Sequence, residues 1–201
     1  MPATKDTPTT RERLIAAMSD TLQRRGLHGA GLNELLALAQ TPKGVLYHHF
    51  PGGKTELAVA AIQAAVAQVG ESLRHLMAVK GDLVPALRSW MSGAQRQLER
   101  SAFERGCPQA TVALESAAED GAIRSALADA FEAIRGQLAA ALVDAGVTEV
   151  RAGQLATLIV AAYEGALMQA RVAGASRPMS DTAEALLGFV QRELEAGMGT
   201  P

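Results

Sequence analysis

The chain has 201 residues, which is long enough to bury a sizeable core as one domain or as two modest ones. Hydrophobic residues make up 48% of the sequence but aromatic residues only 3%, so alanine, leucine and valine supply the apolar content, a mixture that favours helices over sheets. The net charge of −2 hides a mild basic bias, because residues 1–56 hold seven Lys/Arg and five Asp/Glu. That bias is weaker than a strongly basic nucleic-acid binder would show, so charge alone decides nothing.

The first helix is expected to begin near Thr9. Thr9 and Glu12 have the spacing of a capping box, and apolar residues recur at helical spacing over 14–22. Two arginines in the last turn suit the helix dipole, and Gly26 ends the helix. A short apolar helix follows over 32–39.

A third helix is expected over 42–50. Pro42 is well placed in a first turn, where its missing N–H is not needed, and the sequence PGG at 51–53 ends the helix. Only Gln40 and Thr41 separate it from the preceding helix. Three short helices, the last two joined by a tight turn, predict a helix-turn-helix unit.

Beyond Lys54 the pattern changes to long helices, with no strand-like alternation and no internal repeat in the sequence. Asp181 and Glu184 have the spacing of a capping box for the last of them. The expected ranges are 54–79, 82–100, a helix that begins at Pro108, 121–145, 149–173 and 181–196. We therefore expect an all-α protein in two unequal parts, residues 1–53 and 54–201.

Several features predict a soluble cytoplasmic protein. A single cysteine, Cys107, cannot form an internal disulfide, which suits a reducing compartment. The N-terminal sequence has no apolar run of the kind that a signal peptide requires. The most apolar window, 155–170, is interrupted by Glu164 and is too short to span a bilayer, so no membrane contact is expected.

The helix expected over 149–173 is apolar nearly all round, and small residues at 161, 162, 165 and 166 allow close approach. A helix of this kind needs burial on every side. One interpretation is a central core helix. The other, which we prefer, is a homodimer formed through the helices at about 122–145 and 149–173.

Residues 41–54, TPKGVLYHHFPGGK, concentrate lysine, tyrosine and histidine in one short stretch. The GGKT sequence at 52–55 imitates the end of a phosphate-binding loop, but His48 stands where the first glycine belongs and no strand precedes it. His48 and His49 diverge by about 100° on a helix and cannot share a metal ion unaided. Since no catalytic constellation is evident either, we expect no enzyme activity, no cofactor and no metal.

The same stretch suits the second helix of a helix-turn-helix. The inward face would be formed by Val45, Leu46 and Phe50. The outer face would be formed by Lys43, Gly44, Tyr47 and His48. Such a face reads DNA by placing its N-terminal residues on base edges in the major groove. Lys54 begins the next helix, where its ammonium and nearby N–H groups would hold a phosphate. The alternative to DNA binding is that this polar helix face only contacts water.

The run TPKGVLYHHFPGGKTEL resembles the recognition-helix signature of the TetR family of transcriptional regulators. The ending FPGGK, together with FERGCPQATVALE at 103–115, is similar to the LmrA/YxaF-type branch. The resemblance implies that residues 1–53 bind DNA, that residues 54–201 bind an effector and dimerise, and that the protein usually represses. The expected DNA-binding residues are Thr41, Pro42, Lys43, Gly44, Tyr47, His48, His49 and Lys54.

Three positions depart from that family pattern. Gln40 stands where a turn glycine is usual, which predicts either strain or a different turn. Ala30 and Gly31 stand where a phosphate-binding Ser or Thr is common, so the second helix would offer backbone amides only. Val45 replaces a small hydroxyl residue and removes one polar contact.

The larger part is expected to house the effector. Large apolar residues are core more often than pocket, yet Trp90 and Tyr163 each carry a polar group that needs a partner. The candidate ligand-binding residues are Trp90, Met91, Phe103, Cys107, Phe131, Tyr163, Leu167 and Met168. The few interior charges favour an uncharged or weakly charged apolar molecule as effector.

The resulting hypothesis is a homodimer whose two recognition helices contact a pseudo-palindromic operator on double-stranded DNA, with a ligand tilting the helix over 54–79. Two other readings stay open. One is a helical small-molecule-binding protein with a degenerate DNA-binding module. The other is an enzyme that uses the histidine pair.

Overall fold

The computed structural model describes residues 8–198, and every regular element among them is an α-helix, which confirms the predicted all-α fold. The first seven residues, where no signal segment is expected, lie outside this range. No helix of the described residues is long and apolar enough to cross a membrane. The helices are α1 Thr10–Arg25, α2 Leu32–Leu38, α3 Lys43–His49, α4 Gly53–Lys80, α5 Leu83–Arg100, α6 Pro108–Glu115, α7 Gly121–Asp144, α8 Glu149–Ala173 and α9 Arg177–Met198.

The capping box predicted for α1 is present. The Thr9 N–H donates to Glu12 Oε2 (2.7 Å), and the Glu12 N–H donates to Thr9 Oγ1 (3.3 Å). This reciprocal pairing satisfies two backbone donors that a helix start otherwise leaves free. The helix ends at Gly26, as predicted, with a φ of 71° and a ψ of −170°. That combination is essentially restricted to glycine.

The capping box predicted for the last helix is wrong. Helix α9 begins at Arg177, so Asp181 lies inside the helix rather than before it. There the Asp181 carboxylate accepts a hydrogen bond from Arg177 Nε (3.2 Å), four residues earlier. Pro178 falls in the first turn, where its fixed φ favours a helix. The helix therefore begins before Pro178 and not at the Asp181–Glu184 pair.

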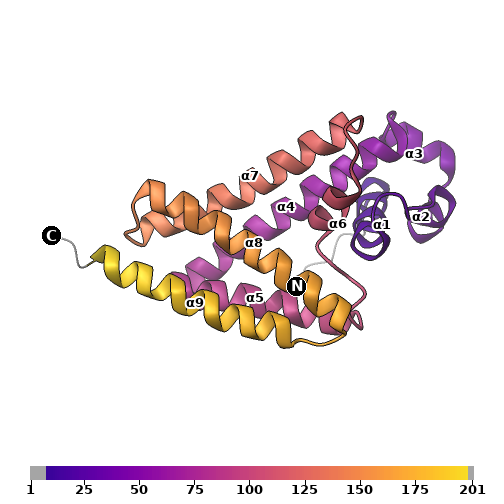
Figure 1. The fold of residues 1–201 in the computed structure, drawn as a ribbon. Helices are drawn as coiled ribbons and strands as arrows, with labels where there is room; N and C mark the ends of the chain where they lie inside the picture. Colours follow the sequence, from indigo (N-terminus) through magenta and orange to yellow (C-terminus); the bar gives the residue numbers. More distant parts are fainter. Residues whose placement is uncertain (1–7, 199–201) are drawn as a thin grey trace, which may run out of the picture.

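The three N-terminal helices form a compact head at one end of the molecule, and α4 runs from that head along α7 (Figure 1). Helices α5, α8 and α9 pack together at the other side, and short α6 lies beside α1 (Figure 1). Helix α9 ends far from the head, at the opposite end of the molecule (Figure 1). The head is therefore connected to the larger helical part through α4 and α6.

Two main hydrophobic cores share α4. The first core joins α1–α3 to the start of α4, to α6 and to α7. As predicted, it includes Leu46 on α3 and Phe50, the residue that follows α3. Val45 is only half-buried. The second core lies among the far half of α4 and α5, α7, α8 and α9. Each large side chain removed from water contributes roughly 1.5–3 kcal/mol, so α4 is held firmly at both of its ends.

Candidate nucleic-acid interface and effector cavities

The turn before α3 is tight and strained. Gln40 adopts a φ of 49°, a left-handed conformation that normally favours glycine. The Thr41 N–H donates to the Leu36 carbonyl (3.0 Å), and the Thr41 hydroxyl donates to the Ala39 carbonyl (2.9 Å). The Thr41 side chain is 6% exposed, so it holds the turn together and does not face outward.

Helix α3 presents one exposed face. Lys43, Gly44, Tyr47 and His48 are exposed, whereas His49 is half-buried with its ring edge-on to His48, 5.2 Å between centroids. A Cβ added at Gly44 would meet nothing within 4 Å. This part of the helix surface is therefore free of side chains and open to a large partner.

The start of α4 packs closely against α3. Gly53 has a φ of 67°, and a Cβ there would lie 3.2 Å from Tyr47 Cε1, so this position requires glycine. The Tyr47 side chain stays 45% exposed. The Gly52 N–H donates to Glu56 Oε2 (2.7 Å), so one amide at this helix start is already occupied by the protein's own carboxylate.

Lys54 is half-buried beside this turn. Burial lowers the pKa of the Lys54 ammonium, and the nearby Glu115 carboxylate acts in the opposite direction. Helix α2 has no side-chain cap: Ala30 is buried and Gly31 is the capping residue, which leaves only backbone groups there.

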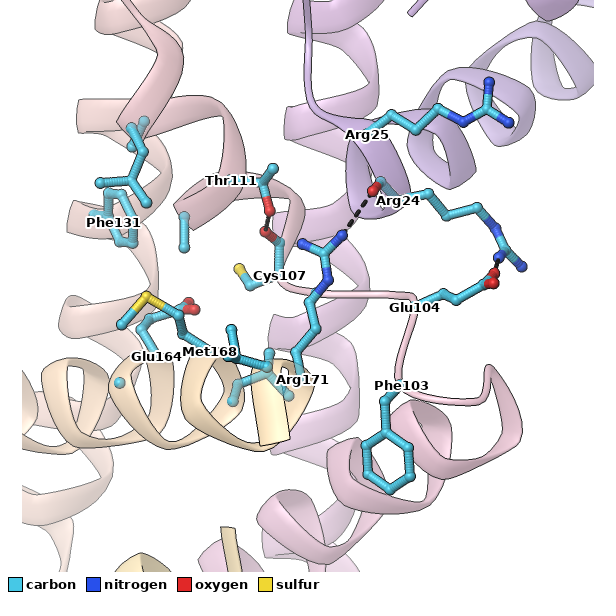
Figure 2. A pocket seen from close by; sticks show the side chains of 17 residues that line it. Arg24, Arg25, Phe103, Glu104, Cys107, Thr111, Phe131, Glu164, Met168 and Arg171 are labelled. Atoms are coloured by element: carbon cyan, nitrogen blue, oxygen red, sulfur yellow. Dashed lines mark hydrogen bonds and ion pairs between the residues drawn. The ribbon is translucent and has the colours of Figure 1, made fainter. Parts of the chain in front are cut away.

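The predicted effector residues lie around two cavities. The larger, of about 910 Å³, is bounded by the end of α1, the loop before α6, and helices α6, α7 and α8 (Figure 2). The predicted residues on its wall are Phe103, Cys107, Phe131, Leu167 and Met168. The smaller, of about 390 Å³, lies among α4, α5, α7 and α8. The predicted residues on its wall are Trp90, Cys107, Tyr163 and Leu167.

Met91 lines neither cavity, and the prediction that it would do so is wrong. It is 2% exposed and belongs to the second core. Consecutive residues on a helix point about 100° apart, so Met91 faces the core where Trp90 faces the cavity. The Trp90 ring stacks on Tyr163, with centroids 4.3 Å apart and planes at 25°.

Phe103 lies on a strained loop. Ala102 and Phe103 have φ values of 52° and 63°, and the Phe103 N–H donates to the Leu98 carbonyl (2.9 Å). Two successive non-glycine residues in the left-handed region cost about 1–3 kcal/mol each. Strain of this kind is concentrated at ligand sites and switches, and here it places the loop on the wall of the larger cavity (Figure 2).

Two buried polar side chains on the cavity walls, Glu164 and Gln109, were not predicted from the sequence. Burial raises the pKa of Glu164 from its ordinary value of 4.5 to about 7, and Glu164 Oε2 has no hydrogen-bond partner. Gln109 is 2% exposed with Nε2 unpartnered, while its Oε1 accepts from Cys107 Sγ (3.0 Å). Burial also raises the pKa of the Cys107 thiol, which keeps it protonated and unreactive. The one signal in the sequence was a carboxylate inside an apolar helix.

The end of α1 is tied to the larger part by several hydrogen bonds. The Gly106 N–H donates to the Gln23 carbonyl (2.9 Å), and Arg171 Nη2 donates to the Arg24 carbonyl (2.6 Å; Figure 2). Glu115 Oε2 accepts from the N–H groups of Leu27 (2.6 Å) and His28 (3.1 Å). Ion pairs add Arg24 to Glu104 and Arg105 to Asp20.

A helix-turn-helix head joined to a larger helical part is the architecture of a DNA-binding transcriptional regulator. Residues 14–61 match the family model described as bacterial regulatory proteins, tetR family, and residues 84–185 match that of the transcriptional regulator LmrA/YxaF-like C-terminal domain. The chain belongs to the TetR family of transcriptional regulators, in its LmrA/YxaF-like branch.

Individual relatives agree with this assignment. The chain is 31% identical to the HTH-type transcriptional regulator YxaF of Bacillus subtilis over 158 residues, which cover 79% of this chain and 83% of that protein. It is 25% identical to LmrA of the same organism over 182 residues, or 90% and 97% of the two chains. The crystal structure of regulatory protein TetR from Rhodobacter sphaeroides matches with a TM-score of 0.76 at 24% identity, covering 89% of this chain and 97% of that one. Regulators of this family bind DNA operators and small-molecule effectors and form dimers.

Proposed function

We propose that the protein is a cytoplasmic homodimeric repressor, which a small, mainly apolar molecule releases from a pseudo-palindromic operator. Residues 1–53 are the DNA-binding domain in this proposal, and residues 54–201 bind the effector and dimerise. It assigns no enzyme activity. The observation that carries it is the open outer face of α3, formed by Lys43, Gly44, Tyr47 and His48.

This face suits the major groove for physical reasons. Gly44 adds no side chain, so the backbone of the first turn can approach the DNA closely. Lys43 supplies charge there, and Tyr47 and His48 supply hydrogen-bonding groups one turn further on. Pro42 leads the helix from an exposed position. Thr41 and His49, which are less exposed, would act by fixing the position of α3.

Phosphate contacts would come from the edge of the head. Lys54 directly follows Gly53 in the chain, and the Tyr47 ring packs against Gly53. Such contacts position the recognition helix without reading sequence. The Glu56 carboxylate already accepts the Gly52 N–H, so fewer amides are free to bind a phosphate. Lys54 would therefore make the main phosphate contact at this turn.

A surface for the second subunit is supported by the outer side of α8. Large apolar side chains are exposed there at helical spacing, and α7 adds one more beside it. The exposed residues are Val143, Val150, Leu158, Met168 and Val172. A two-fold dimer through α7 and α8 would cover them and would present two α3 helices about 34–36 Å apart.

Ligand response would pass through α4, because this helix belongs to both cores. A ligand that fits only one tilt of α4 shifts the separation of the two recognition helices. A coupling of about 1–3 kcal/mol lowers DNA affinity roughly five- to 150-fold, which is enough to switch a promoter.

The test is fluorescence anisotropy with labelled DNA from the upstream region of the protein's own gene, at two salt concentrations and against a scrambled duplex. We expect preference for the natural duplex by about 10³-fold or more, with a steep salt dependence. Lys54→Met should weaken binding and reduce the salt slope by about one. Lys80→Met is the matched control, because Lys80 is exposed about 40 Å away at the other end of α4.

Tyr47→Phe removes only a hydroxyl and should weaken operator binding while leaving the fold intact. Equal, weak binding to both duplexes by the wild-type protein would contradict the proposal. It would favour a helical ligand-binding protein with a degenerate DNA-binding module, in which ligand affinity is indifferent to DNA.

A further inference from the structure

Arg171 connects the larger cavity directly to the DNA-binding head. It lies in the last turn of α8 and lines the cavity, and its Nη2 donates to the main-chain carbonyl of Arg24 (2.6 Å), near the end of α1 (Figure 2). A Cβ added at Gly106 would lie 3.3 Å from Arg171 Nη1, so the guanidinium packs against a loop residue that has no side chain. The hydrogen bond joins residues 147 positions apart in the chain.

The charge of Arg171 is not neutralised by a carboxylate in the described part of the chain. The other two arginines on the cavity wall differ in this respect. Arg24 is paired with Asp20 and Glu104, and Arg25 is paired with Glu34. The Arg24 carbonyl, at the negative end of the α1 dipole, offers Arg171 only a partial charge.

The rest of the cavity wall is mainly apolar. Leu114 at its edge is exposed and lies on α6, outside the surface assigned to the second subunit, so a ligand can enter the cavity from that side. Glu164 lies seven positions before Arg171 on α8, which places the two charged groups about 10 Å apart along the helix. The large and small apolar residues on the same wall are Ala113, Leu114, Phe131, Leu167, Met168 and Val172.

We infer that the larger cavity binds a monoanionic amphipathic acid, with its carboxylate on Arg171 and an apolar body of about 10 Å directed toward Glu164. A planar guanidinium binds a carboxylate through two parallel hydrogen bonds, and such charge-assisted pairs are stronger than a bond to a neutral carbonyl. A second acidic group at the far end would be repelled by Glu164 or would meet a carboxyl that is costly to ionise, which limits the ligand to one anionic group.

The same guanidinium provides the regulation. A carboxylate that engages Nη1 and Nη2 draws Arg171 into the cavity and away from the Arg24 carbonyl. The end of α1 then loses one of its ties to the larger part, and the head is freed from the position that binds DNA. This inference rests on the proposed function, because it names the ligand class and the coupling contact of the same regulator.

The test uses decanoate and naphthalene-2-acetate as probes, each compared with its neutral alcohol, decan-1-ol or naphthalene-2-ethanol. Isothermal titration calorimetry on the full chain should show each acid binding about tenfold or more tightly than its alcohol. Arg171→Met should remove that preference and leave the alcohols unchanged, whereas Arg171→Lys should retain part of it. Arg177→Met is the control, since Arg177 is exposed at the start of α9 and lies outside the cavity. Thermal unfolding of each variant checks that it is folded.

Operator binding measured on the same samples separates this inference from the proposed function. We expect the acids to weaken operator binding of the wild-type protein and of Arg177→Met, but not of Arg171→Met. Specific operator binding combined with acids that bind no better than their alcohols overturns the ligand class and leaves the regulator intact. Binding of the acids through Arg171 without specific operator binding by the ligand-free protein overturns the proposed function instead. Acids that bind through Arg171 and leave operator binding unchanged overturn the coupling.

Discussion

Glu115 is predicted to be the strongest single tie between α6 and the head. Its carboxylate accepts hydrogen bonds from the Leu27 and His28 N–H groups at 2.6 and 3.1 Å, and Oε2 lies 3.5 Å from His28 Nδ1. These amides follow the end of α1. A Cβ added at Gly26 would lie only 1.9 Å from Glu115 Oε1, so the carboxylate occupies the space that glycine leaves open.

The magnitude follows from the two charge-assisted bonds. Each is worth about 1.5–3 kcal/mol, and the Glu115 side chain is 27% exposed, so water recovers part of the loss. We expect Glu115→Ala to lower the free energy of unfolding by about 2–4 kcal/mol. Glu115→Gln keeps one acceptor and should lose about half as much. Gly26→Ala should displace the carboxylate and add about 1–3 kcal/mol of backbone strain.

Urea unfolding at one protein concentration measures these values, and amide hydrogen exchange at Leu27 and His28 reports the site itself. Exchange at both amides should accelerate in Glu115→Ala and in Gly26→Ala. Because both single variants remove the same bonds, the sum counts that loss twice, and the double variant should lose about 2–4 kcal/mol less than the sum. Glu119→Gln, an exposed carboxylate nearby, is the control. Additive losses within 0.5 kcal/mol, or unchanged exchange, would refute this account of the contact.

Three further changes test the strained and buried positions. Since the pKa of Glu164 is raised to about 7, the folded state binds more protons than the unfolded one, so stability should fall by roughly 2 kcal/mol between pH 4.5 and 7. Glu164→Gln should remove that slope in urea unfolding. Gln40→Gly should raise the melting temperature and Gln40→Val should lower it, because only glycine tolerates the φ of 49° freely. The free energies of unfolding of the two variants should differ by about 2 kcal/mol. Gly93→Ala should stabilise α5 by up to ~1 kcal/mol in urea unfolding, because only Arg96 Nη2, at 3.8 Å, lies near the added Cβ.

The exposed face of α3 could be predicted because its causes are local. Pro42 and the glycines at 52 and 53 delimit the helix, and the 3.6-residue period then separates Leu46 from Tyr47 and His48. The turn could be predicted only in part: the sequence left open strain or a different turn at Gln40, and it placed two residues between the helices. In the structure residues 39–42 separate α2 from α3, and Gln40 takes the left-handed conformation.

The cavities could be predicted only in part. Size and apolarity selected residues that largely do line them, but Met91 shows that these properties do not distinguish a cavity wall from the core beside it. The start of α9 was misplaced because two capping signals compete within five residues and the sequence does not rank them.

By itself, the sequence determined the helical class, most helix limits and the helix-turn-helix, since composition, caps and periodicity act between residues within about four positions of one another. Only the tertiary structure decided which charged groups meet. Arg171 finds the Arg24 carbonyl across 147 positions, and Glu115 finds Leu27 across 88. The sequence around one partner does not indicate the other, because such contacts depend on how α1, α6 and α8 pack against the shared cores.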